Sequence, residues 1–448
     1  MLSTSLIAID ATILATAVPA IVDDLGGFSQ FPWLFSIYLL AQAVSTPIYG
    51  RLADVFGRKP VILFGIGLFL LASVLCGFAW SMPALIVFRL LQGLGAGAIQ
   101  PTTITIAGDI YSLRERAVAQ GYIASVWGIS SVVGPALGGL FADLLSWRWI
   151  FFVNIPLCLI AGFILFRNYH EKVERRGQRI DYPGAILLAS GTTLLILGLL
   201  EGGEAWAWNS PLSYGVFALA AVLLVAFVFV ERRVEHPILP LWVFQRRVLL
   251  ASSLISLGVG AVVMGLSTYI PTYAQEVLGA SAVVAGFALA ALTLGWPLAA
   301  SLAGRMYLPL GFRVTTLAGS ALVVVGTGLL LLLGTESAVW QVALFCLIIG
   351  LGMGLLAAPA LIAAQSSVDW NARGVVTGAN MFARSIGSAV GVAVFGAIVN
   401  ATTGSSTTTP SAEALSEGVH IVFIVTAALA VATLVASLFM PKHVTEPS

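Results

Sequence analysis

Residues 50–60 read GRLADVFGRKP and connect one long apolar run to the next. Gly50 and Gly57 allow a tight turn and a close approach of helices, because glycine has no side chain to obstruct either. Asp54 and Arg58 stand four residues apart, a spacing at which two side chains can pair on one helix face. The stretch therefore predicts a tight, charged connection between two helices.

A related stretch, GRMYLPLGFR, occupies residues 304–313. Both stretches begin with Gly-Arg and place a second glycine seven residues further on, between the second and third apolar runs of a six-run unit. Duplicated halves around a central site are typical of secondary transporters. The pattern predicts six-helix halves at 1–167 and 248–448, with a linker and two inserted helices in 168–247.

Long apolar runs occur along the whole chain. Of the 448 residues, 59% are hydrophobic and 9% are charged, whereas soluble domains carry about 25% charged residues. A helix that crosses a bilayer needs about 20 mostly apolar residues. Such runs cover residues 2–22, 33–53, 60–79, 83–107, 117–142, 148–167, 182–201, 212–230, 248–270, 282–303, 314–334, 340–365, 374–399 and 419–440. The composition predicts an all-α polytopic membrane protein with fourteen spans.

Basic residues gather on one side of the predicted membrane. Eighteen of the 21 lysines and arginines lie in alternate connections, from Arg51 to Lys442. The other connections hold only Arg148, together with acids such as Asp24 and Glu201. Because cytoplasmic loops carry an excess of Lys and Arg, the basic side is expected to be cytoplasmic. An even number of spans then places both termini there.

Several other classes of protein find little support in the sequence. The net charge is only +1, so no overall field favours nucleic acid. The chain has no HExxH motif, catalytic-triad signature or phosphate-binding glycine loop. The three cysteines, Cys76, Cys158 and Cys346, stand in separate apolar runs, as expected of small buried side chains. Neither a metal nor an organic cofactor is expected, and a membrane-embedded enzyme or receptor is an unfavoured alternative.

The 50–60 stretch resembles the loop signature of the major facilitator superfamily. The resemblance implies that Gly50, Asp54, Gly57 and Arg58 form a cytoplasmic latch that stabilises the outward-facing state. An ordinary basic loop that obeys the charge rule is the alternative reading.

Three further stretches resemble motifs of the fourteen-span drug:proton antiporters in this superfamily. Residues 85–97 (LIVFRLLQGLGAG) resemble the motif of span 4, and residues 9–19 (IDATILATAVP) resemble that of span 1, although the usual Asn is missing. Residues 128–139 (GISSVVGPALGG) resemble the antiporter motif of span 5, which in the family accompanies export. Its small residues and bend come from Gly128, Gly134, Pro135, Gly138 and Gly139. Generic packing by small residues is the alternative.

Only three ionisable residues lie clearly inside predicted spans: Asp10, Arg89 and Arg384. An ionisable residue in the membrane is a candidate functional site. Burial disfavours an ionised carboxyl group and a nearby cation favours it, so such a group can couple to protons. At the helical rise, Asp10 lies about 18 Å from the outer end of its span, Arg384 about 15 Å from either face and Arg89 about 9 Å from the outer end. Depth therefore predicts an Asp10–Arg384 pair, with Arg89 organising the outer half or reaching the outer surface. A static structural ion pair is the alternative.

Polar and aromatic residues inside the spans are candidates for a substrate cavity, although each could equally serve helix packing. Those ranked highest are Gln42, Gln92, Trp127 and Asn380.

The sequence thus predicts a proton-coupled antiporter of the plasma or inner membrane. Its cargo is expected to be hydrophobic cationic drugs or other amphipathic small molecules, because a lone acid can bind either one cation or one proton. The energy source is expected to be the proton gradient, and the protein a monomer in the bilayer. An exporter of an endogenous lipid or metabolite, or a uniporter, would keep the same fold.

Overall fold

The computed structural model describes residues 1–26, 30, 33–171, 181–203, 205–403 and 412–443, and its regular structure is helical, with no named strand in those ranges. The first part contains α1 (Leu2–Leu25), α2 (Trp33–Phe56), α3 (Arg58–Gly77), α4 (Met82–Ile110), α5 (Leu113–Leu144), α6 (Trp149–Phe152) and α7 (Asn154–Asn168). The middle contains α8 (Tyr182–Glu201), α9 (Pro211–Glu231) and α10 (Trp242–Gln245). The last part contains α11 (Arg247–Thr272), η2 (Tyr273–Val277), α12 (Ala282–Leu310), α13 (Phe312–Leu330), α14 (Val339–Ser366), η3 (Trp370–Ala372), α15 (Arg373–Thr403) and α16 (Ala412–Ser437).

The lengths of these helices follow from their apolar runs, and their starts follow from local capping. Ser81 and Ser281 each accept a hydrogen bond from the N–H of the residue three positions on, at the starts of α4 and α12. Asp181 does the same for α8. Such caps satisfy one of the N–H groups that a helix leaves free at its start.

Twelve helices in the described ranges are long and apolar enough to cross a membrane, and the bent α1 makes up to thirteen. Its two segments, Leu2–Leu14 and Thr16–Leu25, meet at 65°. The less apolar α2 is not among them. An all-helical polytopic protein is confirmed, whereas the count of fourteen and the cytoplasmic termini stay predictions.

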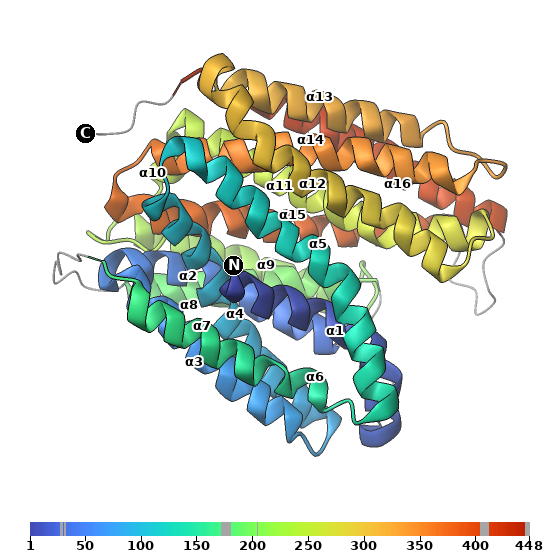
Figure 1. Ribbon diagram of the computed structural model, residues 1–448, viewed down its shortest axis with the longest axis horizontal. Coiled ribbons are helices and arrows are strands. Elements are labelled where there is room, and N and C mark those ends of the chain that lie inside the picture. The colour runs from blue at the N-terminus through green and yellow to red at the C-terminus, as the bar shows by residue number, and fades with distance from the viewer. Residues whose placement is uncertain (27–29, 31–32, 172–180, 204, 404–411, 444–448) are drawn as a thin grey trace.

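Two groups of helices run along the long axis of the molecule. In Figure 1, α3 and α7 lie at the bottom of the view and α13 and α14 at the top. The two groups meet where α2 packs on α15 and α5 packs on α12. The pair α8 and α9 pack on each other, and α8 contacts α2 and α15. The predicted boundaries at 1–167, 168–247 and 248–448 stay a prediction, and residues 172–180 of the predicted linker lie outside the described ranges.

The backbone repeats itself at the two Gly-Arg stretches. Gly57 has φ 97° and immediately precedes α3, and Gly311 has φ 91° and immediately precedes α13. Positive φ values of this kind favour glycine. The sequence repeat therefore corresponds to one turn geometry used twice.

Candidate functional site

Five side chains form a cluster, here called the latch cluster, between the two groups of helices, and two of them, Asp54 and Arg58, are buried. The five are Asp54, Arg58, Asp109, Trp370 and Arg373. Arg58 Nη2 lies 2.9 Å from Asp54 Oδ1, and Arg58 Nε donates to Asp109 Oδ2 at 3.0 Å. Arg373 Nη1 lies 3.1 Å from the other oxygen of Asp109. The Arg58 guanidinium also stacks on the Trp370 ring at 3.6 Å. The cluster thus joins α2, α3 and α4 to the start of α15.

Asp54 has a second function, because its carboxylate caps α15. Its two oxygens accept the backbone N–H groups of Gly374 at 2.9 Å and Val375 at 2.7 Å. The start of a helix carries partial positive charge and free N–H groups, so a carboxylate there is stabilising. One side chain of α2 therefore holds both Arg58 and the first turn of α15, at the end of the bundle that is here called the latch side.

The close packing of α2 on α15 leaves no room for a side chain at Gly50. A Cβ added to Gly50 would lie 2.5 Å from the carbonyl oxygen of Gly374 and 3.2 Å from Cα of Gly378. No side chain fits between two backbones at that separation, and overpacking costs about 1–3 kcal/mol. We therefore expect Gly50→Val to hold the latch side open, as seen in faster labelling of a cysteine placed at Val375, which is buried at the start of α15, in a cysteine-free background.

A matched control for Gly50→Val is Gly67→Val, because nothing lies within 4 Å of a Cβ at Gly67. The control should label like the parent protein. Equal labelling of the Gly50 and Gly67 variants would contradict the packing argument.

A second buried cluster, here called the Asp10 cluster, lies within the first group of helices. Arg89 Nη1 of α4 lies 2.6 Å from Asp10 Oδ2 of α1. Gln92 Nε2 and Asn154 Nδ2 donate to the other oxygen at 2.8 Å and 3.0 Å. Both amides also reach the hydroxyl of Ser73 on α3, at 2.9 Å and 3.4 Å. Three helices, α1, α4 and α7, therefore meet at one carboxylate, the residue of which is 1% exposed, and α3 supports the two amides.

Arg89 is fixed by more than its carboxylate partner. Its Nε donates to the Leu34 carbonyl at 3.1 Å, its Nη1 donates to Gln92 Oε1 at 2.8 Å, and its guanidinium lies 4.3 Å from the centre of the Tyr38 ring. Leu34 and Tyr38 belong to α2, so the arginine also connects that helix. A buried charge is tolerated only when it is paired and hydrogen-bonded in this way.

The prediction that Arg384 is the partner of Asp10 is wrong. Arg89 takes that position, and it neither reaches the surface nor stands apart, since it is 1% exposed. The depth estimate assumed straight helices, whereas the axis of α1 turns by 65° along its length. A long arginine side chain also spans more than a turn, so a difference of one or two turns in depth does not separate two residues.

Comparison with known proteins identifies the family. The family described as Major Facilitator Superfamily matches residues 1–392 of the chain. The chain belongs to the major facilitator superfamily. Multidrug resistance protein 3 of Bacillus subtilis is 36% identical to it over 391 residues, 87% of this chain and 76% of that protein. Multidrug transporter protein MdtP of Bacillus subtilis is 35% identical over 398 residues, 89% and 74% of the two chains.

More distant proteins agree with this assignment. The fungal Efflux pump dotC of Dothistroma septosporum is 32% identical over 398 residues, 87% of this chain and 69% of that one. The crystal structure of the human organic anion transporter MFSD10 is similar with a TM-score of 0.70 and 15% identity, and covers 97% of both chains, which shows a shared fold. The present chain is therefore a multi-pass membrane transporter and not an enzyme, as the sequence predicted.

The antiporter-type motif of this transporter packs α5 against two helices. A Cβ at Gly134 would strike Thr12, and one at Gly138 would strike Thr16 and Ile13, all on α1. A Cβ at Gly128 would lie 3.3 Å from the Thr293 carbonyl oxygen of α12.

For two residues of the motif, the structure gives no close approach to a neighbouring helix. Gly139 has open space around it, and the side chain of Pro135 lies outside what the structure describes. Packing on α1 places α5 beside the helix that carries Asp10. Any role of the motif in export stays a prediction.

Two of the four residues predicted to line a cavity have structural duties instead. Gln92 is fully buried in the Asp10 cluster. Asn380 is 6% exposed, and its amide joins α15 to Ser252 and Ser256 of α11. In the structure these two residues therefore join helices and do not line a cavity.

The other two predicted cavity residues keep accessible surface. Gln42 is half-buried and hydrogen-bonded to Gln100 of α4. Trp127 is half-buried on α5. Their substrate role stays a prediction.

Several residues of both clusters were missed or ranked low. Asn154 and Ser73 are ordinary polar residues in apolar runs, with no spacing that links them to Asp10. Asp109 and Trp370 lie 51 and 312 residues from Arg58 along the chain. A search for every polar side chain within an apolar run would have found Asn154 and Ser73, but no local signal joins the other two to Arg58.

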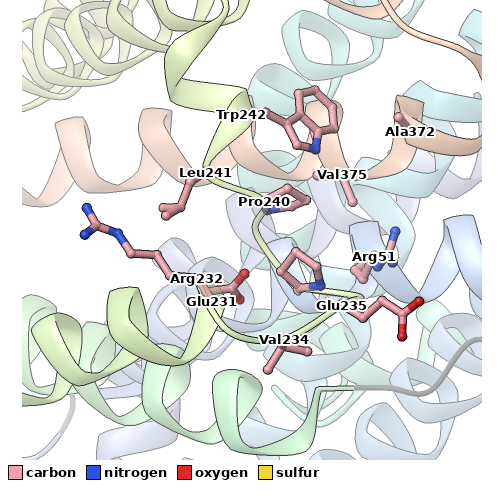
Figure 2. A pocket seen from close by; sticks show the side chains of 11 residues that line it. Arg51, Glu231, Arg232, Val234, Glu235, Pro240, Leu241, Trp242, Ala372 and Val375 are labelled. Carbon is pink, nitrogen blue, oxygen red and sulfur yellow. The ribbon is translucent and has the colours of Figure 1, made fainter.

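A cavity of about 380 Å³ lies on the latch side, beside the segment that follows α9 (Figure 2). Its lining includes Arg51 of α2, Trp242 of α10 and Val375 of α15. Glu231, at the end of α9, is also in the lining, and its Oε1 accepts the N–H groups of Ile238 at 3.0 Å and Leu239 at 3.2 Å. The cavity therefore lies between the end of α9 and the latch side, and it shares no residue with the Asp10 cluster.

Proposed function

We propose that this transporter exports drugs and other amphipathic small molecules in exchange for protons, by alternating access. The observation that carries the proposal is the Asp10 carboxylate, buried and held by donors from α4 and α7. The relatives named as multidrug transporters and as an efflux pump support the direction of transport and the kind of cargo.

Proton coupling follows from the chemistry of the Asp10 cluster. An ionised carboxylate accepts the hydrogen bonds of Arg89, Gln92 and Asn154. When Asp10 binds a proton it loses its charge, and Arg89 is left as a buried cation without a counter-charge, which is costly. Relief of that cost requires Arg89 to move. Because Arg89 also contacts Leu34 and Tyr38, its movement is transmitted to α2.

The latch cluster connects that movement to alternating access. Asp54 lies on the same helix, α2, and holds the start of α15. A rotation of α2 would withdraw the cap from α15 and open the latch side. The outward-facing state then corresponds to the closed latch cluster described above.

The topology belongs to the same proposal. We count α2 as a span because it packs among α4, α8 and α15, and a helix covered by protein on several sides needs less apolar surface than one facing lipid. With α1, and with α6 and α7 taken as one span, this gives fourteen spans and places both termini on the basic, cytoplasmic side. The transporter is proposed to work as a monomer that uses the proton gradient.

Transport by purified protein in proteoliposomes tests the proposal. The probes are a cationic dye, a neutral amphiphile and an anionic amphiphile. An imposed pH gradient should drive accumulation of at least one of them, and a protonophore should abolish that accumulation. Accumulation unchanged by the protonophore would favour a uniporter. Failure of every compound to move would point to an endogenous lipid or metabolite as cargo.

A further inference from the structure

Arg384 lies on a face of α15 that points into the bundle. Thr377, seven residues earlier, accepts a hydrogen bond from Gln365 of α14 at 2.8 Å. Asn380 is bonded to α11, and Ser388 donates to the Gly260 carbonyl of α11 at 3.2 Å. Positions three, four and seven apart share a helix face, so Arg384 projects between α11 and α14. Its guanidinium lies 5.0 Å from the centre of the Trp296 ring of α12.

The packing on this face opens at the level of Arg384. Thr377 is fully buried and Asn380 is 6% exposed, whereas Arg384 is exposed. Since this face is turned towards other helices and not towards lipid, the accessible surface of Arg384 faces a space inside the bundle. A guanidinium with accessible surface inside a bundle costs less than one in contact with lipid.

Arg384 brings a positive charge to that space. In the described ranges Arg384 takes part in no ion pair. Asp10, which the sequence predicted to be the partner of Arg384, is neutralised by Arg89 and is 1% exposed. If Asp10 instead binds a proton, Arg89 adds a second positive charge. Neither protonation state offers a negative site to a cationic cargo.

We propose that Arg384 binds the anionic group of the cargo, and that this transporter selects aromatic organic anions over cations. The inference rests on the proposed export function and replaces the cationic drugs that the lone acid suggested. A guanidinium binds a carboxylate, phenolate or sulfonate through paired N–H donors. A neutral cargo would displace water without replacing its hydrogen bonds, and a cationic cargo would be repelled.

Trp296 is a positioning residue in this proposal. A guanidinium that stacks on an indole uses its flat face, and its N–H groups stay free at the edge. The ring also offers an apolar surface for the aromatic part of the cargo. Trp296→Ala should therefore weaken binding of all aromatic probes, whereas loss of Arg384 should remove only the preference for an anion.

Equilibrium binding to the full-length protein in nanodiscs tests the proposal without a proton gradient. The probes are 2-naphthoate, 2-naphthamide and 2-naphthylmethylammonium, which share one ring system and differ in charge. The parent protein should bind the naphthoate about tenfold to hundredfold more tightly than the amide, and the ammonium most weakly. Arg384→Gln should bind the naphthoate no better than the amide, with the affinity for the amide unchanged.

Two further variants test whether the preference for an anion depends on the guanidinium of Arg384. Arg384→Lys should keep part of the preference, because it keeps the charge and loses the planar fork. Arg313→Gln, an exposed arginine at the start of α13, should keep the whole preference.

The proposal would be overturned by equal binding of the three probes to the parent protein, by no binding of any probe, or by an intact preference in Arg384→Gln. A binding preference without gradient-driven transport would instead contradict the proposed antiport and leave the anion site standing. Gradient-driven transport without a binding preference would support the proposed antiport and contradict the anion site.

Discussion

Replacement of Asp10 by Asn should abolish accumulation of cargo driven by a pH gradient. Asn has the shape of Asp and can accept a hydrogen bond, but it cannot gain or lose a proton. The Asp10 cluster would then keep one charge state on both sides of the membrane. We expect accumulation in proteoliposomes to fall to the level reached without a gradient, while exchange of labelled for unlabelled cargo continues.

The design must separate loss of coupling from loss of folding. Asp10→Asn leaves Arg89 buried without its partner, and breaking a buried ion pair costs about 3–5 kcal/mol. The double variant Asp10→Asn with Arg89→Gln removes both charges, so it should recover thermal stability and remain uncoupled. Asp24→Asn is the matched control, because Asp24 forms an exposed ion pair with Arg148. Gradient-driven accumulation by the double variant would disprove the role of Asp10.

Replacement of Asp54 by Asn should shift the transporter towards a state that is open on the latch side. The change removes the charge that holds Arg58 and weakens the cap on Gly374 and Val375. A penalty of about 3–5 kcal/mol for the broken buried pair corresponds to roughly 10²- to 10⁴-fold in the equilibrium between the states. Distances between spin labels on the latch-side ends of α2 and α15 should lengthen.

Asp369→Asn is the matched control for the latch, because Asp369 is exposed and lies next to Trp370. Its distance distribution should equal that of the parent protein. Unchanged distances in Asp54→Asn would show that the latch cluster does not set the balance between the two states.

Much of the fold and part of the site could be predicted from local sequence. The apolar runs gave the helices because a chain this apolar must satisfy its backbone polar groups inside each segment in lipid. Gly50 and Gly57 predicted a tight connection, and Gly57 has a positive φ there, which favours glycine. Asp54 and Arg58 could be paired from their spacing, since they lie one turn apart on α2 and the start of α3.

The partners of the buried charges could not be predicted in this way. Asp10 pairs with Arg89, 79 residues away, and Arg58 with Asp109, 51 residues away. Such pairs depend on helix bends, side-chain reach and the rotation of each helix about its axis, and depth in the membrane reports none of these. The rotation of α15 likewise decided that Asn380 packs on α11 while Arg384 meets an internal space.

By itself, then, the sequence determined a polytopic helical transporter and the few charged residues that stand inside its apolar runs, because each depends on the chemistry of neighbouring residues. Only the tertiary structure decided which charges neutralise one another and which one is left facing the interior. That difference changes the expected cargo from cation to anion, since a carboxylate already held by an arginine offers no charge to a ligand.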